Sequence, residues 1–159
     1  MIVIADSSAL IALETCSALD ILVALHDDIY VPPAVYREVT YPSKPHANNL
    51  RAFLQNRVVD VDKSQVIIAV GGLGEGELEA MALYQQLAAN RLLIDDRRAR
   101  RVAEANGIQC IGALGLLLLA KHQNHIPSIA PYIVRLRDSS LYYSESLLRK
   151  VLELSGEPS

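Results

Sequence analysis

Short apolar runs alternate with helix-forming stretches along the chain, and this alternation restricts the possible folds more than any other feature. Runs rich in Ile, Val and Leu are typical of strands buried on both faces of a parallel sheet. The expected strands cover residues 2–5, 29–31, 58–61, 92–94 and 108–111. The expected helices cover residues 9–13, 18–25, 34–39, 48–54, 77–89, 98–106, 114–122, 129–136 and 144–154. The pattern predicts an α/β fold with a mostly parallel sheet, helical covers and right-handed crossovers.

Length and composition indicate one folded domain. The chain has 159 residues, of which 51% are hydrophobic and 21% charged, and this balance excludes a disordered protein. Only 5% are aromatic, so the core must be aliphatic. We expect a single domain over residues 1–159, with a frayed tail at 156–159. Residues 66–70 have an ambiguous, strand-like composition, and the glycine-rich residues 71–76 are expected to form a mobile loop.

The charge balance and the cysteine content limit how the protein could bind a polyanion and in which redox compartment it is expected to fold. The net charge of −3 excludes a global basic field, so a polyanion would have to bind a local patch. Cys16 and Cys110 are too few for a disulfide framework and lack metal-site spacing, which indicates a reducing cytoplasm. No basic segment precedes the first apolar run, and the longest uncharged apolar run, residues 110–120, is too short to cross a bilayer. We therefore expect neither a signal peptide nor a membrane segment.

Acidic side chains stand where ligands bind in open α/β sheets. Asp6 directly follows the first expected strand, and Asp95 and Asp96 follow a later one. Glu77 opens a helix after the glycine-rich loop. Because ligands bind outside the carboxyl ends of the strands, these side chains could face one crevice. Crowded carboxylates repel one another unless a cation neutralises them, and Mg²⁺ or Mn²⁺ prefers such oxygen ligands. A metal held by these side chains could activate a water against a phosphodiester.

Each of these residues also has a purely structural interpretation. Asp6 and the aspartate doublet could cap the helices that follow them. Glu77 could complement the dipole at the start of its helix. Ser7 or Ser8 could cap the first helix or hydrogen-bond a metal-bound water. The pattern alone leaves the choice between helix caps and a metal site open.

Five segments, in this order, resemble the PIN-domain family of nucleases. They are residues 2–11 (IVIADSSALI), 31–39 (VPPAVYREV), 76–83 (GELEAMAL), 93–100 (LIDDRRAR) and 111–117 (IGALGLL). The last segment is similar to one branch of the family, small prokaryotic PIN proteins that are often paired with an antitoxin. The resemblance runs over essentially the whole chain.

The resemblance implies a PIN-like, three-layer α/β/α sandwich around a central, mostly parallel sheet. It also implies Mg²⁺- or Mn²⁺-dependent cleavage of RNA, in many members as the toxin of a type II pair with a small antitoxin protein. Carried over by position, the catalytic acids and metal ligands would be Asp6, Glu38, Glu77 and Asp96, with Asp95 as an additional metal ligand. Asp6 is the firmest of these ligands. Glu38 is selected by the resemblance alone, since it would otherwise be an ordinary surface acid.

The chain departs from the family pattern at three positions. The third acid is commonly Asp, whereas here it is Glu77, whose longer side chain places its oxygens differently. Glu75 and Glu79 are nearby competitors for that role. Gly74 stands where relatives of this branch often carry an acid, and Ile94 stands where Ser or Thr is common. These departures predict a metal affinity or substrate range unlike that of better-known relatives.

An arginine cluster follows the aspartate doublet. Its members are Arg97, Arg98, Arg100 and Arg101. We expect Arg97, Arg98 and Arg101 to share one side of a helix and to bind RNA phosphates. The alternative is a solvated helix face that pairs with acids such as Glu104. Because aromatic residues are scarce, stacking on bases is expected to contribute less than contacts to the RNA backbone.

Apolar surface is concentrated toward the C-terminus. Residues 114–119 and the last expected helix carry more of it than one side of a sheet needs. This surplus predicts either a homodimer interface or a tight aliphatic core, and a disordered antitoxin segment could also lay a helix into such a groove.

Two other functional classes compete with a metal-dependent ribonuclease. The first is a PIN-fold nucleic-acid-binding module that cleaves weakly or not at all, which the change at Glu77 keeps open. The second is a receiver-like phosphoacceptor domain, for which the chain lacks a persuasive Asp at the middle strand and a matching late Lys.

Overall fold

A four-stranded parallel sheet lies at the centre of the molecule. The computed structural model describes residues 1–62, 64 and 72–159. The strands are β1 (Ile2–Ala5), β2 (Asp28–Tyr30), β3 (Arg91–Leu93) and β4 (Cys110–Ile111). Their order is β2-β1-β3-β4, and every neighbouring pair is parallel. In the register, Ile4 of β1 lies opposite Tyr30 on one side and Leu92 on the other. The predicted α/β class is confirmed.

Helices follow each strand of the sheet. In the first half of the chain they are α1 (Ser7–Thr15), α2 (Leu19–Leu25), α3 (Pro33–Val39) and α4 (Ala47–Leu54). In the second half they are α5 (Glu75–Gln86), α6 (Arg97–Ala105), α7 (Ala113–His122), α8 (Ala130–Arg137) and α9 (Glu145–Leu154). All of the expected helices form, with ends shifted by a few residues.

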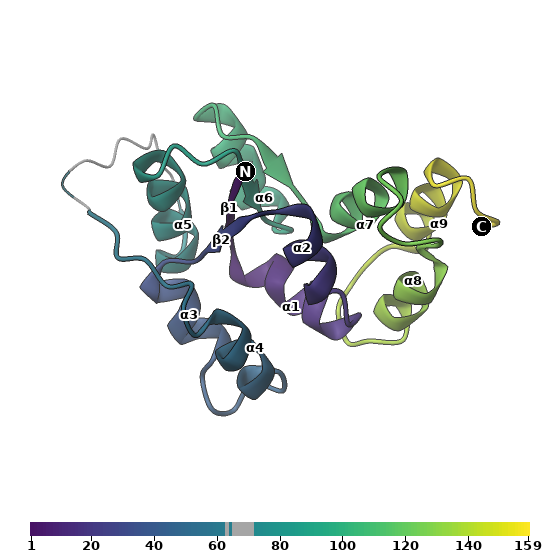
Figure 1. Ribbon diagram of the computed structural model, residues 1–159, viewed down its shortest axis with the longest axis horizontal. Coiled ribbons are helices and arrows are strands. Elements are labelled where there is room, and N and C mark those ends of the chain that lie inside the picture. The colour runs from purple at the N-terminus through teal and green to yellow at the C-terminus, as the bar shows by residue number, and fades with distance from the viewer. Residues whose placement is uncertain (63, 65–71) are drawn as a thin grey trace.

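The helices form two layers around the sheet. Right-handed crossovers, the rule for parallel strands, place α1 and α2 on one face and α5 and α6 on the other. Helix α7 packs against α1 and α2, α5 packs on β1 and β3, and α6 packs on β4. Figure 1 shows α7, α8 and α9 gathered at one end of the molecule, away from α3 and α4. The arrangement confirms the three-layer α/β/α architecture.

The core is aliphatic, as the composition predicts. Ile4, Leu92 and Leu93 of the sheet are fully buried, and so are Leu116 and Leu117 of the leucine-rich helix α7. All of them belong to one continuous cluster. The chain therefore covers much of the apolar surface of α7 by itself, as the tight-core alternative predicts, and the homodimer stays a prediction.

The strand expected at residues 58–61 does not form. Only an isolated parallel bridge joins Val58 to Val31. Just beyond it, the side chain of Gln86 accepts a hydrogen bond from the Asp62 N–H (2.8 Å) and donates one to the Asp60 carbonyl oxygen (3.0 Å). A side chain of α5 thus takes backbone bonds that a neighbouring strand would otherwise make, and the prediction of an extended strand here is wrong.

Glu157, within the tail that is expected to fray, is tied to the body of the protein. Its carboxylate accepts hydrogen bonds from the N–H groups of Ile129 (2.8 Å) and Ala130 (3.0 Å) at the start of α8. It also pairs with Lys121 Nζ at 2.9 Å. The tail therefore caps a helix that lacks a capping side chain of its own.

The segment before α5 is only partly described. The ambiguous residues 66–70 and Gly71 lie outside the described part of the chain. Helix α5 begins at Glu75, after Gly74 as its N-cap, so the last two residues of the expected loop belong to the helix.

Within residues 1–62, 64 and 72–159, no single helix is long and apolar enough to cross a lipid bilayer. Helices α1 and α2 have the required length and apolar composition only when taken together, and they are bent by 115° relative to each other.

Candidate active site

Asp6 lies at the carboxyl end of β1 and is almost completely buried, with 3% of its surface exposed. Its N–H donates to the Leu93 carbonyl oxygen at 2.8 Å, which extends the pairing of β1 with β3 by one residue. Burial raises the pKa of the Asp6 carboxyl from 3.8 to about 6, and the negative charge of Glu77 adds to this rise. Hydrogen bonds from Ser7 and Ser8 offset only part of it. The fold therefore places an acid where its charged form is costly.

Ser8 connects the acid of β1 to the acids of β3. Its Oγ donates to Asp6 Oδ2 at 3.2 Å and accepts from the N–H groups of Asp95 (3.0 Å) and Asp96 (3.3 Å). One hydroxyl has one donor and two acceptor positions, and all three are used here. Ser8 thus fixes the ends of two neighbouring strands relative to each other.

Two further acids reach the same region from α3 and α5. Ser7 Oγ, next to Asp6, donates to Glu38 Oε2 at 3.0 Å. A Cβ on Gly76 would lie 3.1 Å from Glu38 Oε2, so the first turn of α5 passes close to this carboxylate. Glu38 lines a hollow of about 360 Å³ together with Glu77 of α5. Helices far apart in sequence therefore bring two acids to one surface.

The pKa of Glu77 depends on its burial and on the charges of its neighbours. Its pKa is raised chiefly by burial and then by the negative charges of Asp96 and Glu38, while a backbone hydrogen bond from Gly74 and the charge of Arg98 oppose the rise. Together with the effect of Glu77 on Asp6, these interactions link all four of the acids expected from the resemblance. Glu77 thus interacts with each of the other three acids, and we call Asp6, Glu38, Glu77 and Asp96 the acidic cluster.

The aspartate doublet divides its two side chains between different tasks. Asp96 is the N-cap of α6, and its Oδ1 accepts from the Ala99 N–H at 2.8 Å. Asp95 faces the other way: its Oδ1 accepts from the Ala113 N–H (2.8 Å) and its Oδ2 from the Tyr143 hydroxyl (2.9 Å). The capping interpretation therefore holds for Asp96, and the structure does not bring the Asp95 oxygens to the acidic cluster.

The two competitors of Glu77 are engaged elsewhere. Glu75 forms a surface ion pair with Arg37 at 3.3 Å. Glu79 is buried, and its Oε1 accepts from the Ala34 N–H (3.1 Å) near the start of α3. The charge of Glu77, by contrast, acts on Asp6.

The acidic cluster fits a divalent cation by its chemistry more than by its present spacing. Its donors are carboxylate oxygens, which hard cations such as Mg²⁺ and Mn²⁺ prefer. Burial, and to a smaller extent their mutual repulsion, raises the pKa of Asp6 and of Glu77, and a bound cation would offset their negative charge. Among the described residues, no three His, Cys, Asp or Glu side chains lie close enough together to hold an ion directly. Since Mg²⁺ keeps several waters when bound, some of these contacts would run through water.

The arginines of α6 have different neighbours. The Arg98 guanidinium lies against Gly72, where an added Cβ would collide with it, and its charge acts on Glu77. Arg97 and Arg101 instead line a separate hollow together with Arg100. Successive helix positions are turned by about 100°, which keeps Arg97, Arg98 and Arg101 within one broad side of α6 while Arg98 faces Gly72 at its edge. The phosphate-binding roles of Arg97, Arg98 and Arg101 stay predictions.

Some of the positioning residues have no clear signal in the sequence. Ser7 and Ser8 were expected only as caps or water ligands, yet they hold Glu38 and Asp6. Tyr143, which holds Asp95, comes 48 residues later in the chain, and no local pattern selects it.

Comparison with known proteins agrees with this architecture. A PIN-domain family matches residues 2–157. Among solved structures, a PilT N-terminus domain protein from the hyperthermophilic archaeon Sulfolobus solfataricus P2 is similar, with a TM-score of 0.51 and 15% identity, and the match covers 90% of this chain and 100% of that protein. No curated protein matches the sequence. The family match spans nearly every residue, including the whole acidic cluster, and the chain therefore belongs to the PIN-domain family.

Proposed function

We propose that the protein is a Mg²⁺- or Mn²⁺-dependent endoribonuclease whose active site is the acidic cluster. PIN domains have a nuclease-type fold, and their members generally bind nucleic acid and use divalent metals. The observation that carries the proposal is the burial of Asp6 beside Glu77, which raises its pKa to about 6. A buried carboxyl beside a second acid adds no stability to the fold at neutral pH, and such perturbed acids are typical of functional sites.

The residues of the cluster have separable roles. Asp6, Glu38, Glu77 and Asp96 would hold the cation, directly or through water. When bound, the cation supplies an activated water and offsets the charge of the phosphodiester in an in-line displacement. Ser7 and Ser8 keep two of the carboxylates in fixed positions through hydrogen bonds of 3.0 and 3.2 Å.

Positive charge beside the cluster would position the substrate. Arg98 acts on Glu77 and is exposed, so its guanidinium can bind a phosphate next to the scissile bond. Asp95 holds the N-terminus of α7 instead, and we assign the ligand role of the doublet to Asp96.

We also propose the biological setting implied by the resemblance. In it the protein is a cytoplasmic toxin of a type II pair, acts on cellular RNA, and forms a homodimer bound by a small antitoxin protein. The support is the similarity of residues 111–117 to the toxin-like branch of the family. Growth arrest on expression of the wild type, and normal growth with Asp6→Asn, is the expected result in a bacterial host.

Cleavage of RNA by the purified protein tests the activity. We expect the wild type to cleave a panel of single-stranded RNAs with Mg²⁺ or Mn²⁺, and to stop when EDTA is added. Asp6→Asn should lose this activity, and Asp138→Asn, which changes an exposed carboxylate of similar size, should keep it. Equal cleavage by wild type and Asp6→Asn would assign the activity to a contaminant.

A nucleic-acid-binding module without cleavage is the second candidate. It is favoured by the spacing of the acids, since within the described residues no three potential ligands converge on one point. It predicts RNA binding that is unaffected by Asp6→Asn, with no cleavage of any RNA by the wild type in either metal.

A further inference from the structure

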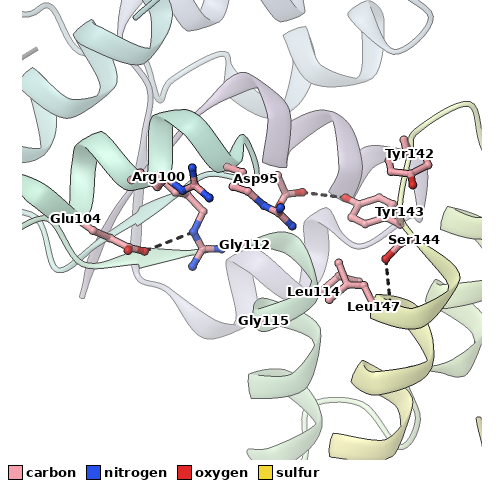
Figure 2. A pocket seen from close by; sticks show the side chains of 12 residues that line it. Asp95, Arg100, Glu104, Gly112, Leu114, Gly115, Tyr142, Tyr143, Ser144 and Leu147 are labelled. Carbon is pink, nitrogen blue, oxygen red and sulfur yellow. Dashed lines mark hydrogen bonds and ion pairs between the residues drawn. The ribbon is translucent and has the colours of Figure 1, made fainter. Parts of the chain in front are cut away.

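A second hollow lies beside the acidic cluster, between α6, the start of α7 and residues 142–147. Its volume is about 700 Å³, in the range of pockets that bind small ligands. Figure 2 shows Arg100 of α6 on one side of it and Tyr142 and Tyr143 on the other, with Leu114 and Leu147 between them. We call it the arginine pocket. None of the four acids of the acidic cluster lines it.

The arginine pocket carries positive charge that the protein leaves largely unpaired. Arg100 pairs with Glu104 at 3.7 Å. Arg97 and Arg101 are exposed, and neither has an acidic partner within 4.0 Å among the described residues. The acid that lies near Arg100, Asp95, already accepts two hydrogen bonds. Two guanidinium groups are therefore available for an anion, and a phosphate matches their planar donor geometry.

The opposite wall presents an aromatic ring to solvent. Tyr142 is 91% exposed, the most exposed of the large apolar side chains described. Its neighbour Tyr143 is fixed by the hydrogen bond to Asp95 Oδ2, and Leu147 is also 41% exposed at the rim. An exposed ring at the edge of an arginine-lined pocket is suited to stack on a nucleobase.

The arginine pocket is continuous with the acidic cluster. A smaller hollow of about 260 Å³ shares Asp95, Tyr142 and Tyr143 with it and reaches Ser8 and Asp96 on its other side. A ligand that runs from the arginines to the acids must therefore pass Tyr142. A flexible polyanion with planar groups, namely a single strand of RNA, meets the phosphate-binding, stacking and length requirements together.

We propose that the arginine pocket is a subsite for a nucleotide of single-stranded RNA, whose base stacks on Tyr142 and whose phosphate binds Arg97 and Arg101. The proposal rests on the ribonuclease function and adds how the substrate is held beside the cleavage site. It also revises the expectation that stacking contributes little to RNA binding. Paired bases in a duplex cannot reach Tyr142, so the subsite selects single strands.

RNA binding without divalent metal tests the subsite separately from cleavage. The measurement is fluorescence anisotropy of a labelled single-stranded RNA with the full chain in EDTA. Tyr142→Ala should weaken binding about tenfold, because it removes the ring on which the base stacks, whereas Tyr142→Phe keeps a ring and should bind like the wild type. Tyr41→Ala, which removes a ring that is 62% exposed far from this pocket, is the matched control and should change nothing.

The arginines are tested by the salt dependence of binding. The double variant Arg97→Ala/Arg101→Ala should reduce the slope of log affinity against log salt by about 1.4, as expected for two lost phosphate contacts with a single strand. Arg149→Ala/Lys150→Ala removes the same charge from exposed positions outside the pocket and should leave the slope unchanged.

Each alternative outcome separates the two proposals. Unchanged binding by Tyr142→Ala and by the double arginine variant, in a protein whose cleavage requires Asp6, overturns the subsite and leaves the ribonuclease intact. Binding that depends on Tyr142 in a protein that cleaves no RNA supports the subsite and overturns the ribonuclease. The subsite is also overturned if Tyr142→Ala weakens the binding of duplex RNA as much as that of single-stranded RNA. It is likewise overturned if a free nucleoside monophosphate binds the wild type as tightly as the RNA does.

Discussion

The ionised side chain of Asp6 lowers the folding stability of the protein, and the reason is its position in the acidic cluster. It is 3% exposed, and burial and the charge of Glu77 raise its pKa from 3.8 to about 6. A carboxyl whose pKa is raised on folding contributes stability at pH values below 3.8, and this contribution is lost as the pH rises through about 6. At neutral pH the ionised Asp6 therefore destabilises the fold, on the order of 2–3 kcal/mol.

Replacing Asp6 with Asn should stabilise the protein at neutral pH. The amide has nearly the same shape, carries no charge and can still accept the hydrogen bond from Ser8. We expect the Tm of Asp6→Asn in EDTA to exceed that of the wild type by about 5–10 °C at neutral pH, with the difference vanishing toward pH 3.8. Thermal unfolding across this pH range, with Asp138→Asn as the control, measures the effect. A lower Tm for Asp6→Asn at neutral pH would contradict the account.

The two aspartates after β3 should respond differently to substitution. Asp96→Ser keeps a good N-cap for α6 but removes a carboxylate from the acidic cluster. We expect it to retain its stability and to lose RNA cleavage. Asp95→Asn keeps an acceptor for the Ala113 N–H and should retain cleavage. RNA cleavage and Tm measured on both variants show which aspartate is the metal ligand. Loss of cleavage in Asp95→Asn but not in Asp96→Ser would make Asp95 the ligand.

Among the elements, α8 depends on a residue from outside itself. Burial alone would raise the pKa of Glu157, but hydrogen bonds from Ile129, Ser128, Lys121 and Ala130 lower it from 4.5 to about 2. A pKa lowered on folding means that the ionised carboxylate stabilises the protein at pH values above 4.5. That stability is lost as the pH falls toward about 2.

Glu157→Gln should therefore destabilise the protein above pH 4.5 and have less effect in acid. The loss of a charged acceptor for several buried donors predicts a decrease of about 1–3 kcal/mol in the free energy of unfolding. Denaturant unfolding at neutral pH measures it. Glu153→Gln, an exposed position on α9, is the control, and equal stability of the two variants would show that the tail is not anchored through its charge.

Elements with a strong local pattern could be predicted from the sequence. The apolar runs of β1 and β3 and the acids that follow them place the carboxyl ends of two strands side by side. The expected strand at 58–61 failed because a side chain of α5 takes its backbone bonds. Local pattern cannot report a competitor that lies more than twenty residues away in the chain.

At the scale of the whole molecule, the site depends on contacts between distant segments. Ser7 meets Glu38 across 31 residues, and Asp95 meets Tyr143 across 48. The residue types of the acidic cluster could be predicted by resemblance, but the division of labour between Asp95 and Asp96 could not, because it depends on where α7 and Tyr143 pack. The arginine pocket likewise exists only once α6, α7 and the segment before α9 are assembled (Figure 2).

Direct measurement of Mn²⁺ binding tests the central claim, that the acidic cluster is a cation site used for RNA cleavage. Isothermal titration of Mn²⁺ into the wild type, Asp6→Asn and Asp138→Asn is combined with cleavage assays on the same preparations. The account predicts that the wild type and Asp138→Asn bind Mn²⁺ and cleave RNA, and that Asp6→Asn, although folded and more heat-stable, does neither. Equal Mn²⁺ binding by Asp6→Asn and the wild type would contradict it.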